Sequence, residues 1–212
     1  TADYTDIGLL HLICSTPDMP RLFVRNTDRP ALDRMMDEHD GELWLEMPFD
    51  EDAQEEYYRA LKTAMLLSDW ADEMPDARIC ERYSVGPGDV YGMVESVNWL
   101  LHASGELSRM FAQTFHQGIR EYEICMKNGI RRELLPLVKL RGIGRVRARR
   151  LFNNGITSPE AVLEAGVGKV TTLIGRGIAE QVFAQLEKGG RSAPQLAGED
   201  DMAGQSTLSH FR

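Results

Sequence analysis

The residues best suited to chemistry in this 212-residue chain are cations gathered beside a glycine turn. Gly142 and Gly144 permit a sharp turn and a close approach of the backbone, and Ile143 between them is expected to anchor the turn in a core. A helix that begins there directs its free N–H groups outward, where its positive end stabilises a phosphate. Basic side chains follow the turn and can reach neighbouring phosphates; they are Arg145, Arg147, Arg149 and Arg150. We therefore predict a site for a phosphate backbone, bound without reading its sequence.

The charge of the chain is unevenly distributed, which favours a polyanionic partner for this turn. The whole chain has a net charge of -9. Residues 1–83 contain 20 acids and 8 bases, a net of -12, whereas residues 131–150 contain 8 bases and 1 acid, a net of +7. Asymmetry of this kind points to a polyanion at the basic segment. A solvated basic face on a tight helical hairpin without a ligand remains the alternative.

A second, weaker copy of the turn follows further along the chain. Gly175, Arg176 and Gly177 lie between Ile174 and Ile178, in the same order of apolar residue, glycine, any residue, glycine and apolar residue. Two such hairpins usually pack into one compact unit, so we expect Gly175 and Gly177 to belong to the same binding surface. A second turn with a purely structural role is equally consistent with the pattern.

A tryptophan lies off the apolar stripe of a long predicted helix that starts near Pro87. At about 100° per residue, one apolar stripe on this helix contains Val90, Met93, Val94, Val97, Leu100 and Leu101. Trp99 lies on roughly the opposite side, together with Glu95, Ser96 and His102. Either Trp99 packs against a second surface of a central helix, or it stacks on a nucleic-acid base. Spacing alone does not separate these two interpretations.

The elements that must position these residues are helices, because the 3–4 spacing of apolar residues recurs and β-branched alternation never persists. We predict an all-α fold: a multi-helix bundle over residues 1–134 and a small helical unit over residues 135–188. In the bundle, helices are expected over 7–13, from Asp28 onward, over 52–70 and 77–83, from Pro87 onward, and twice within 105–129. In the small unit, the first hairpin joins a helix ending within 134–140 to one over 146–153. Residues 189–212 change to Gly, Ser, Pro, Gln and Asp, which predicts a flexible tail.

No catalytic or metal-binding pattern accompanies these elements. The cysteines Cys14, Cys80 and Cys125 are far apart and fit no metal spacing, so we expect free thiols in a reducing cytosol. Residues 167–170 (VGKV) lack the first glycine and the hydroxyl residue of a nucleotide-binding loop. Residues 37–40 (DEHD) follow an amphipathic helical run where a helicase box would follow a buried strand. No apolar run approaches the roughly 20 residues of a membrane span. We therefore expect no catalytic residue, metal or cofactor in this chain, no membrane partner and a cytoplasmic location.

Three segments together resemble the C-terminal part of archaeal Ski-like superfamily-2 DNA repair helicases. They are residues 6–19 (DIGLLHLICSTPDM), 86–101 and 140–156, in the family's order, and the last also resembles the helix-hairpin-helix motif of DNA-repair proteins. The resemblance covers residues 1 to about 188. It implies that the bundle is a ratchet domain, whose long helix lies along single-stranded DNA behind an ATP-driven motor. It also implies that the terminal unit is a helix-hairpin-helix domain that grips the leaving 3′ strand.

The resemblance also assigns roles to individual residues. Trp99 matches a family tryptophan that stacks on a base, and residues 147–149 (RAR) match an Arg-Ala-Arg element that grips the strand. The family often has an arginine two turns before the tryptophan, whereas this chain has Gly92, which lacks the cation for that second DNA contact. With the turns above, the predicted DNA-binding residues are Trp99, Gly142, Ile143, Gly144, Arg145, Arg147, Arg149, Arg150, Gly175 and Gly177.

The implied function is the DNA-binding portion of an ATP-dependent 3′-to-5′ DNA helicase in repair or restart of replication forks. Single-stranded and forked DNA would be its partners, and missing motor domains in the same protein would bind ATP and Mg²⁺. A different class remains open: a stand-alone helix-hairpin-helix adaptor that recruits partners to branched DNA. A third option is that the acidic bundle is mainly a protein-binding surface.

The end of the chain resembles the sliding-clamp binding peptide of replication and repair proteins. Gln205, Leu208 and Phe211 follow its order of glutamine, apolar residue and aromatic residue, although Arg212 stands where a second aromatic is usual. Leu208 and Phe211 share one side of a single helical turn, so they can fill an apolar pocket on a clamp while Gln205 bonds at its edge. An unstructured end with two incidental apolar residues is the alternative.

Overall fold

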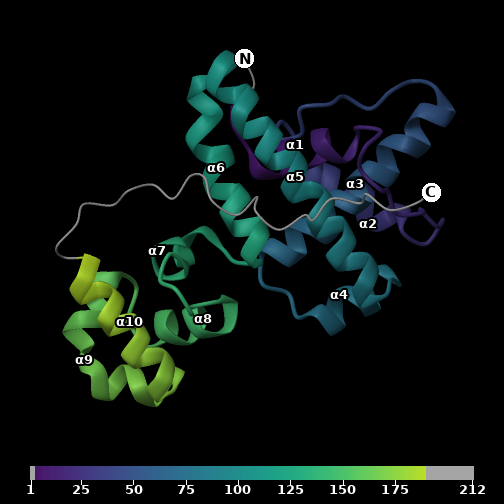
Figure 1. Cartoon of the computed structure of the whole chain (residues 1–212). Helices are drawn as coiled ribbons and strands as arrows, with labels where there is room; N and C mark the ends of the chain where they lie inside the picture. The colour runs from purple at the N-terminus through teal and green to yellow at the C-terminus, as the bar shows by residue number, and fades with distance from the viewer. Residues whose placement is uncertain (1–2, 190–212) are drawn as a thin grey trace, which may run out of the picture.

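A computed structural model describes residues 3–189 of the chain, and within this range the fold is all-helical, as predicted (Figure 1). The described residues form ten α-helices and one 3₁₀ turn, with no strand among them. The elements are α1 (Asp6–Cys14), α2 (Arg29–Glu38), α3 (Glu51–Ala71), α4 (Asp76–Tyr83), α5 (Pro87–Phe111), α6 (Gln113–Asn128), the 3₁₀ turn η1 (Arg132–Leu134), α7 (Leu135–Val138), α8 (Arg145–Asn153), α9 (Pro159–Ile174) and α10 (Arg176–Gly189). The predicted clamp-binding residues Gln205, Leu208 and Phe211 lie outside the described range.

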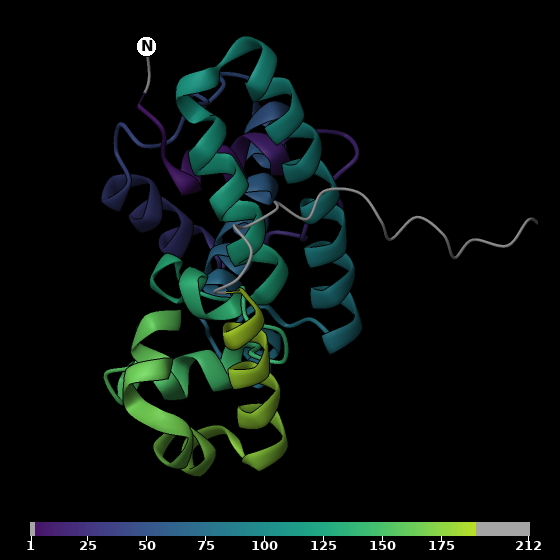
Figure 2. The ribbon, with the colours of Figure 1, turned by 60° about the vertical axis from the view of Figure 1, so that its left-hand side comes forward.

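The bundle is built around α3, whose inner side is fully buried. Leu61, Leu66 and Leu67 of α3 have no exposed surface, and α1 packs along the same helix with Leu10 equally buried. Helices α5 and α6 run side by side and cover another side of the bundle, as both ribbon views show (Figures 1 and 2). This arrangement leaves one long side of α5 facing outward.

Most helices occur where periodicity places them, but one expectation is wrong: only one helix follows within residues 105–129, because α5 continues to Phe111. Gly105 does not end the helix. A Cβ at Gly105 would lie 2.9 Å from Cδ of Arg120 on α6, so the glycine allows the two helices to approach closely. The Ser108 hydroxyl donates to the Gly105 carbonyl at 2.8 Å and stays buried inside this contact.

Asp28 stands at the start of α2, as expected, but its carboxylate does not cap the helix. It accepts a hydrogen bond from the Arg25 backbone N–H at 2.8 Å and one from the Lys62 ammonium at 2.6 Å. Lys62 is only 7% exposed, so its charge requires this partner. The Asp28 carboxylate thus serves a tertiary contact with Lys62 and not an N-cap of α2.

The small unit of α7–α10 packs its own apolar residues and lies beside the bundle (Figure 2). Leu137, Leu151, Val162, Val170 and Val182 are fully buried. Its helices are joined by glycines with positive φ, and α9 itself bends at a glycine of this kind, where φ is 76°. The helix expected to end within 134–140 is two short pieces, η1 and α7.

Candidate nucleic-acid interface

The first glycine turn has the geometry that the sequence predicts. Gly142 has φ of 88°, a conformation that favours glycine, and Ile143 is 4% exposed. Gly144 is extended and stands at the N-cap of α8, where it has no side chain to cap the helix. A Cβ at Gly144 would meet nothing within 4 Å. The first residues of α8 instead line a hollow at the positive end of the helix.

A hollow of 510 Å³ lies at this helix end, between the two glycine turns. It is lined by Gly144, Arg145, Val146, Arg147, Arg150 and Ile174. The exposed Arg147 donates to the carbonyl of Gly142 at 3.1 Å, and the exposed Arg150 donates to the carbonyl of Leu173 at 2.9 Å. Because Leu173 and Ile174 directly precede the second turn, the fold brings both turns to one concave surface. We call this surface the hairpin hollow.

The other two arginines of the run bind the bundle. The Arg145 guanidinium donates to the Met74 carbonyl at 2.6 Å and lies over the Trp70 ring, 5.0 Å from its centroid. The Arg149 guanidinium makes two hydrogen bonds to the Glu73 carboxylate, at 2.8 and 2.6 Å, and an ion pair with Glu133 at 2.6 Å. Both guanidinium groups also have a carboxylate partner, Asp76 for Arg145 and Glu73 for Arg149, whereas Arg147 and Arg150 have none among the described residues.

The charged groups at the contact between α8 and the bundle stabilise one another. Burial alone would raise the pKa of Glu73, but hydrogen bonds from Arg149 and from the Arg131 backbone N–H hold that pKa below its usual value. The hydrogen bond to Glu73 likewise raises the pKa of Arg149 above its ordinary range. Glu73 also has φ of 67°, an uncommon conformation for a residue with a side chain. The Glu73 backbone is thus held in a conformation in which its carboxylate can accept hydrogen bonds from both Arg149 and the Arg131 backbone N–H.

The second glycine turn is open in the same way. Gly175 has φ of 87°, and a Cβ at Gly175 or at Gly177 would meet nothing within 4 Å. Arg176 between them forms an ion pair with Glu180, one turn further along α10, at 2.7 Å. The turn contributes Ile174 to the hairpin hollow, while the glycines themselves do not line it.

Trp99 lies on the outward side of α5 and is 65% exposed, so the described structure excludes packing in a second core surface. Val90, Met93, Val94, Val97 and Leu101 of the opposite stripe are buried, and Leu100 is half-buried. Within residues 3–189 the Trp99 ring has no aromatic partner and its indole N–H no hydrogen bond. Its neighbour His102 contacts Glu123 at 3.0 Å. A large flat apolar surface is thus presented outward, as a stacking role requires.

Trp99 is followed by further exposed apolar residues, which were not among the predicted site residues. Leu107 is 57% exposed, Met110 69% and Phe111 80%, all on the same helix. They follow Trp99 at helical spacing through Ala103, so a second stripe was detectable from periodicity. The apolar surface of α5 therefore extends from Trp99 to the end of the helix.

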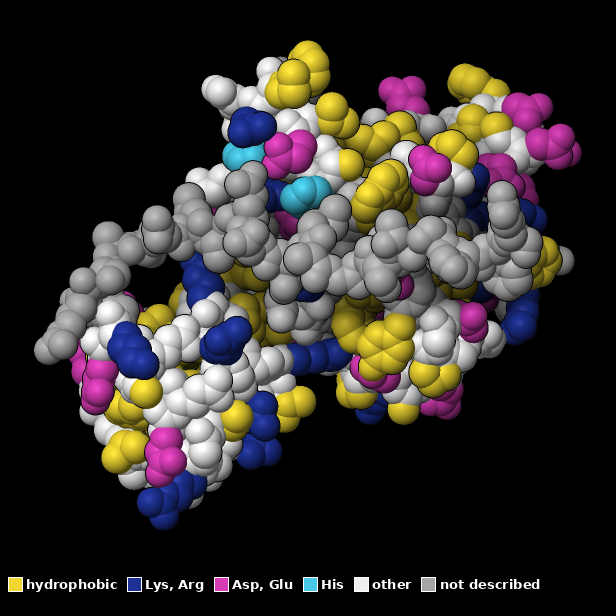
Figure 3. Space-filling model, in the orientation of Figure 1, with side chains coloured by type: hydrophobic (Ala, Val, Ile, Leu, Met, Phe, Trp, Pro, Cys, Tyr) yellow, Lys and Arg dark blue, Asp and Glu magenta, His cyan; other side chains and the backbone are white. Residues whose placement is uncertain are grey.

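The charges separate over the surface as the sequence predicts. In Figure 3 dark blue Lys and Arg side chains gather over the small unit of α7–α10, whereas the magenta acidic side chains are densest at the far end of the bundle. Part of this basic surface belongs to the hairpin hollow. Basic side chains are therefore concentrated on one unit of a chain whose net charge is -9.

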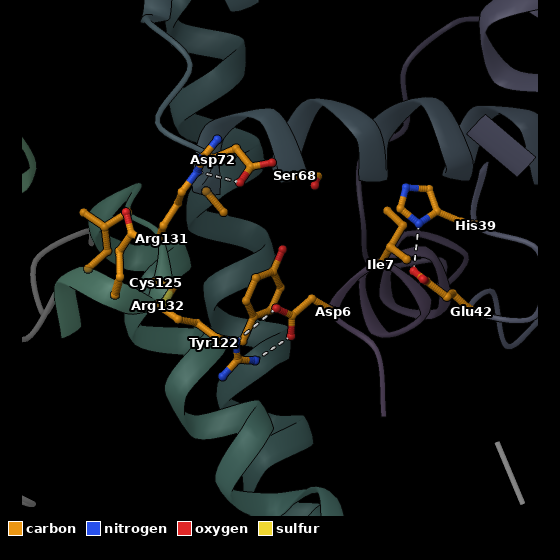
Figure 4. Close-up of a pocket in the computed structure, with 13 residues that line it drawn as sticks. Asp6, Ile7, His39, Glu42, Ser68, Asp72, Tyr122, Cys125, Arg131 and Arg132 are labelled. Atoms are coloured by element: carbon orange, nitrogen blue, oxygen red, sulfur yellow. Dashed lines mark hydrogen bonds and ion pairs between the residues drawn. The ribbon is translucent and has the colours of Figure 1, made fainter. Parts of the chain in front are cut away.

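A polar cavity of 430 Å³ lies where α1, α3 and α6 meet residues 130–133, which lead from α6 to the small unit (Figure 4). Its charged residues are bound to one another: Arg132 to Asp6 at 2.6 Å and Arg131 to Asp72 at 3.1 Å. His39 contacts Glu42 at 2.7 Å at the other side of the cavity. The two arginine pairs connect distant segments, and the remaining charged residue of the lining, Glu133, is paired with Arg149. We therefore interpret the cavity as a structural contact between these segments and not as a ligand-binding site.

The two sequence patterns that were compared with nucleotide-binding and helicase motifs lie in or directly after helices. Residues 37–40 cover the end of α2 and the turn after it, and residues 167–170 lie inside α9. All three cysteines are free, with Cys14 and Cys125 buried. Among residues 3–189 no group of three or more His, Cys, Asp or Glu side chains is placed to hold a metal ion. None of the helices in that range is both long and apolar enough to cross a membrane.

Comparisons with known proteins match both helical units. The family described as "Archaeal helicase, domain 4" matches residues 7–129, and the family described as "SAM-like Helix-hairpin-helix tandem" matches residues 134–188. Curated proteins named "ATP-dependent DNA helicase Hel308" are also similar to the chain. The one from Methanocella arvoryzae is 35% identical over 99% of this chain, the one from Thermococcus kodakarensis 36% over 84%, and the one from Pyrococcus abyssi 32% over 86%.

The chain spans only a fraction of these relatives: 29%, 16% and 26% of their respective lengths. The match to the first family covers more than half of the chain, and it includes the helix that carries Trp99. The match to the second covers both glycine turns. This chain therefore belongs to the archaeal helicase domain 4 family, with a SAM-like helix-hairpin-helix tandem following that domain.

Proposed function

We propose that this chain is the DNA-binding C-terminal portion of an ATP-dependent 3′-to-5′ DNA helicase that acts in repair or restart of replication forks. The bundle guides the translocating single strand along α5, and the helix-hairpin-helix unit grips the strand as it leaves. ATP and Mg²⁺ belong to motor domains outside this chain. Single-stranded and forked DNA are the proposed ligands. The names of the similar proteins support the activity, and the hairpin hollow supports the DNA contact.

We also propose a division into a bundle of residues 1–134 and a helix-hairpin-helix unit of residues 135–188. The two family matches, to residues 7–129 and 134–188, support this boundary. So does the end of α6 at Gly129, which has a left-handed backbone with φ of 59°. A Cβ at Gly129 would lie 2.8 Å from the Trp70 ring, so the chain turns out of the bundle at a position where glycine is required.

The main support for the proposed DNA contact is the N-terminus of α8, which lines a hollow beside two exposed arginines. Arg147 and Arg150 line the same hollow as Gly144, and neither has a carboxylate partner among the described residues. Backbone N–H groups and guanidinium groups are both donors that suit phosphate oxygens. Trp99 supplies the stacking surface for a base on the other helical unit.

The experiment is a titration of single-stranded DNA at two salt concentrations with the Arg147→Gln/Arg150→Gln variant. Because removal of each phosphate contact lowers the salt slope by about 0.7 on single strands, removal of two should lower it by about 1.4. The matched control is Arg34→Gln/Arg78→Gln, which removes the same charge from two exposed positions on the bundle. Equal effects of the two variants would show that DNA binding depends only on the net charge of the chain. They would refute the hairpin hollow as the DNA-binding site.

The stand-alone adaptor is separated from the helicase portion by two observations. An upstream reading frame that encodes two ATPase-type domains would support the helicase portion, and its absence would support the adaptor. Trp99→Ala in the full-length protein should impair DNA unwinding more than ATP hydrolysis if Trp99 couples strand movement to the motor. An adaptor has no such coupling to lose.

A further inference from the structure

A second basic hollow lies on the small unit, on the other side of the first glycine turn. It has a volume of 670 Å³ and is lined by Lys139, Arg141, Gln181, Ala184, Gln185 and Lys188. It shares no lining residue with the hairpin hollow. Arg141 directly precedes Gly142 and Gly144 ends the same turn, so the two hollows flank one short segment of backbone. We call this second surface the α10 hollow.

The lining of the α10 hollow contains three cations and no acid. Lys139, Arg141 and Lys188 are exposed, and none forms an ion pair with a carboxylate among the described residues. The acids of α10 lie elsewhere: Glu180 is bound to Arg176 at 2.7 Å, and Glu187 does not line the hollow. Positive charge is therefore uncompensated here, unlike at Arg145 and Arg149.

One face of α10 forms most of the hollow. Its four α10 residues lie at positions i, i+3, i+4 and i+7 of that helix and so share one side. The Gln185 side-chain oxygen accepts a hydrogen bond from the Arg141 backbone N–H at 2.9 Å, which fixes the turn against α10. This bond occupies the acceptor of the amide and leaves its N–H₂ group as a donor. The free polar groups of the hollow are thus mostly donors.

We propose that the α10 hollow binds a second stretch of nucleic-acid backbone, next to the stretch held in the hairpin hollow. Uncompensated cations and free amide donors suit a chain of phosphodiesters, which offers only acceptor oxygens and repeated negative charge. The residues that line the hollow include no aromatic side chain, so it offers no ring on which a base could stack. The inference rests on the proposed function and deepens it, because it gives the helix-hairpin-helix unit a second contact surface.

The test is DNA binding by the 212-residue chain carrying Lys139→Gln, Arg141→Gln and Lys188→Gln. Because this variant removes three cations that would each neutralise a phosphate, the salt slope should fall by about 2 on single strands and by about 2.7 on duplex regions of a fork. The matched control carries Arg34→Gln, Arg78→Gln and Lys127→Gln, three exposed cations of the bundle. A triple variant that binds DNA no more weakly than this control would overturn the proposal.

A second pair of variants separates the loss of a DNA contact from a folding defect. The two substitutions, at one position, are expected to change the DNA affinity in opposite directions. Ala184 is exposed and lines the α10 hollow. Ala184→Glu should weaken DNA binding and Ala184→Lys should strengthen it, each severalfold at low salt, whereas damage to the fold cannot raise affinity. Equal affinities for both variants would contradict the proposal.

The outcomes separate this inference from the proposed function. If Arg147→Gln/Arg150→Gln weakens binding and the α10 triple variant does not, only the second site is wrong. If neither variant weakens binding beyond its control, the proposed function of the unit is wrong as well. If polyglutamate binds to the wild-type chain, loses affinity in the triple variant and DNA binding is unchanged, the hollow takes an acidic protein segment and the proposal falls.

Discussion

Arg149 and Glu73 join the two helical units through a bidentate ion pair, in which the guanidinium donates hydrogen bonds of 2.8 and 2.6 Å to the carboxylate. Glu73 follows α3 of the bundle, whereas Arg149 lies in α8 of the small unit. Glu133 adds an ion pair to the same guanidinium at 2.6 Å. The two arginines of the Arg-Ala-Arg element therefore have different surroundings: Arg149 contacts the bundle, whereas Arg147 lines the hairpin hollow.

Arg149→Gln should lower the free energy of unfolding by about 1–3 kcal/mol, because it removes charge-assisted hydrogen bonds that are partly buried. Arg147→Gln should change it by less than about 0.5 kcal/mol, since Arg147 is exposed. Urea unfolding measures both values, and DNA titration of the same proteins should show the reverse order of effects. The assignment fails if Arg147→Gln is the more destabilising substitution.

The same contact predicts a dependence on pH. The pKa of Glu73 is lower in the folded state than its usual value of 4.5, so the folded carboxylate resists protonation. Its contribution to stability is therefore complete above pH 4.5 and is lost as the pH falls through the folded pKa. Glu73→Gln should lack this part of the acid-side loss when unfolding is followed between pH 5 and pH 3.

Trp99→Ala should leave the thermal stability nearly unchanged and weaken single-stranded DNA binding about tenfold, because base stacking on an aromatic ring contributes about 1–3 kcal/mol. The matched control is Trp70→Ala. Trp70 is 7% exposed and donates its indole N–H to the Met126 carbonyl at 2.8 Å. Its loss should cost about 3–5 kcal/mol of stability. A large fall in melting temperature for Trp99→Ala would refute the stacking assignment.

Gly92→Arg should increase both stability and DNA affinity. Gly92 lies inside α5, two turns before Trp99, and a Cβ there would meet nothing within 4 Å. Replacing an exposed helical glycine gains about 1 kcal/mol, and the added cation should raise the salt slope by about 0.7. Gly92→Ala is the control, with the gain in stability and no change in DNA binding. Equal binding by the two variants would place the strand away from this position.

His11 should make the bundle less stable as the pH falls from about 6.5 toward 4. Burial lowers the pKa of His11 to about 4, and neither ring nitrogen has a hydrogen-bond partner in the described structure. The unfolded chain therefore takes up a proton that the folded chain excludes, at a cost of about 1.4 kcal/mol per pH unit. His11→Phe should remove most of the difference between urea unfolding at pH 7.5 and at pH 5.5. A variant that keeps the full difference would assign it to other groups.

A synthetic peptide of residues 200–212 should bind the cognate sliding clamp with roughly micromolar affinity. Leu208 and Phe211 would enter an apolar pocket, and the ordering of the peptide would limit the affinity. Phe211→Ala should abolish binding in a calorimetric titration. Absence of detectable heat for the unchanged peptide at high micromolar concentration would exclude the motif.

The sequence by itself determined the features that depend on local order along the chain. Helix phase is local, so the 3–4 spacing of apolar residues placed the helices and showed that Trp99 lies away from the buried stripe. The turn at Gly142 was equally readable, because a positive φ beside a buried Ile143 is a property of that short segment. The family resemblance depended on such segments as well.

Only the tertiary structure decided which cations are available to a ligand. Arg147 and Arg149 are two residues apart in sequence and alike in type, yet one faces a hollow and the other a carboxylate that follows α3. The α10 hollow likewise joins Arg141 to Gln185, across 44 residues. Long-range packing sets these partners, because the field at a charged side chain depends on every element folded against it.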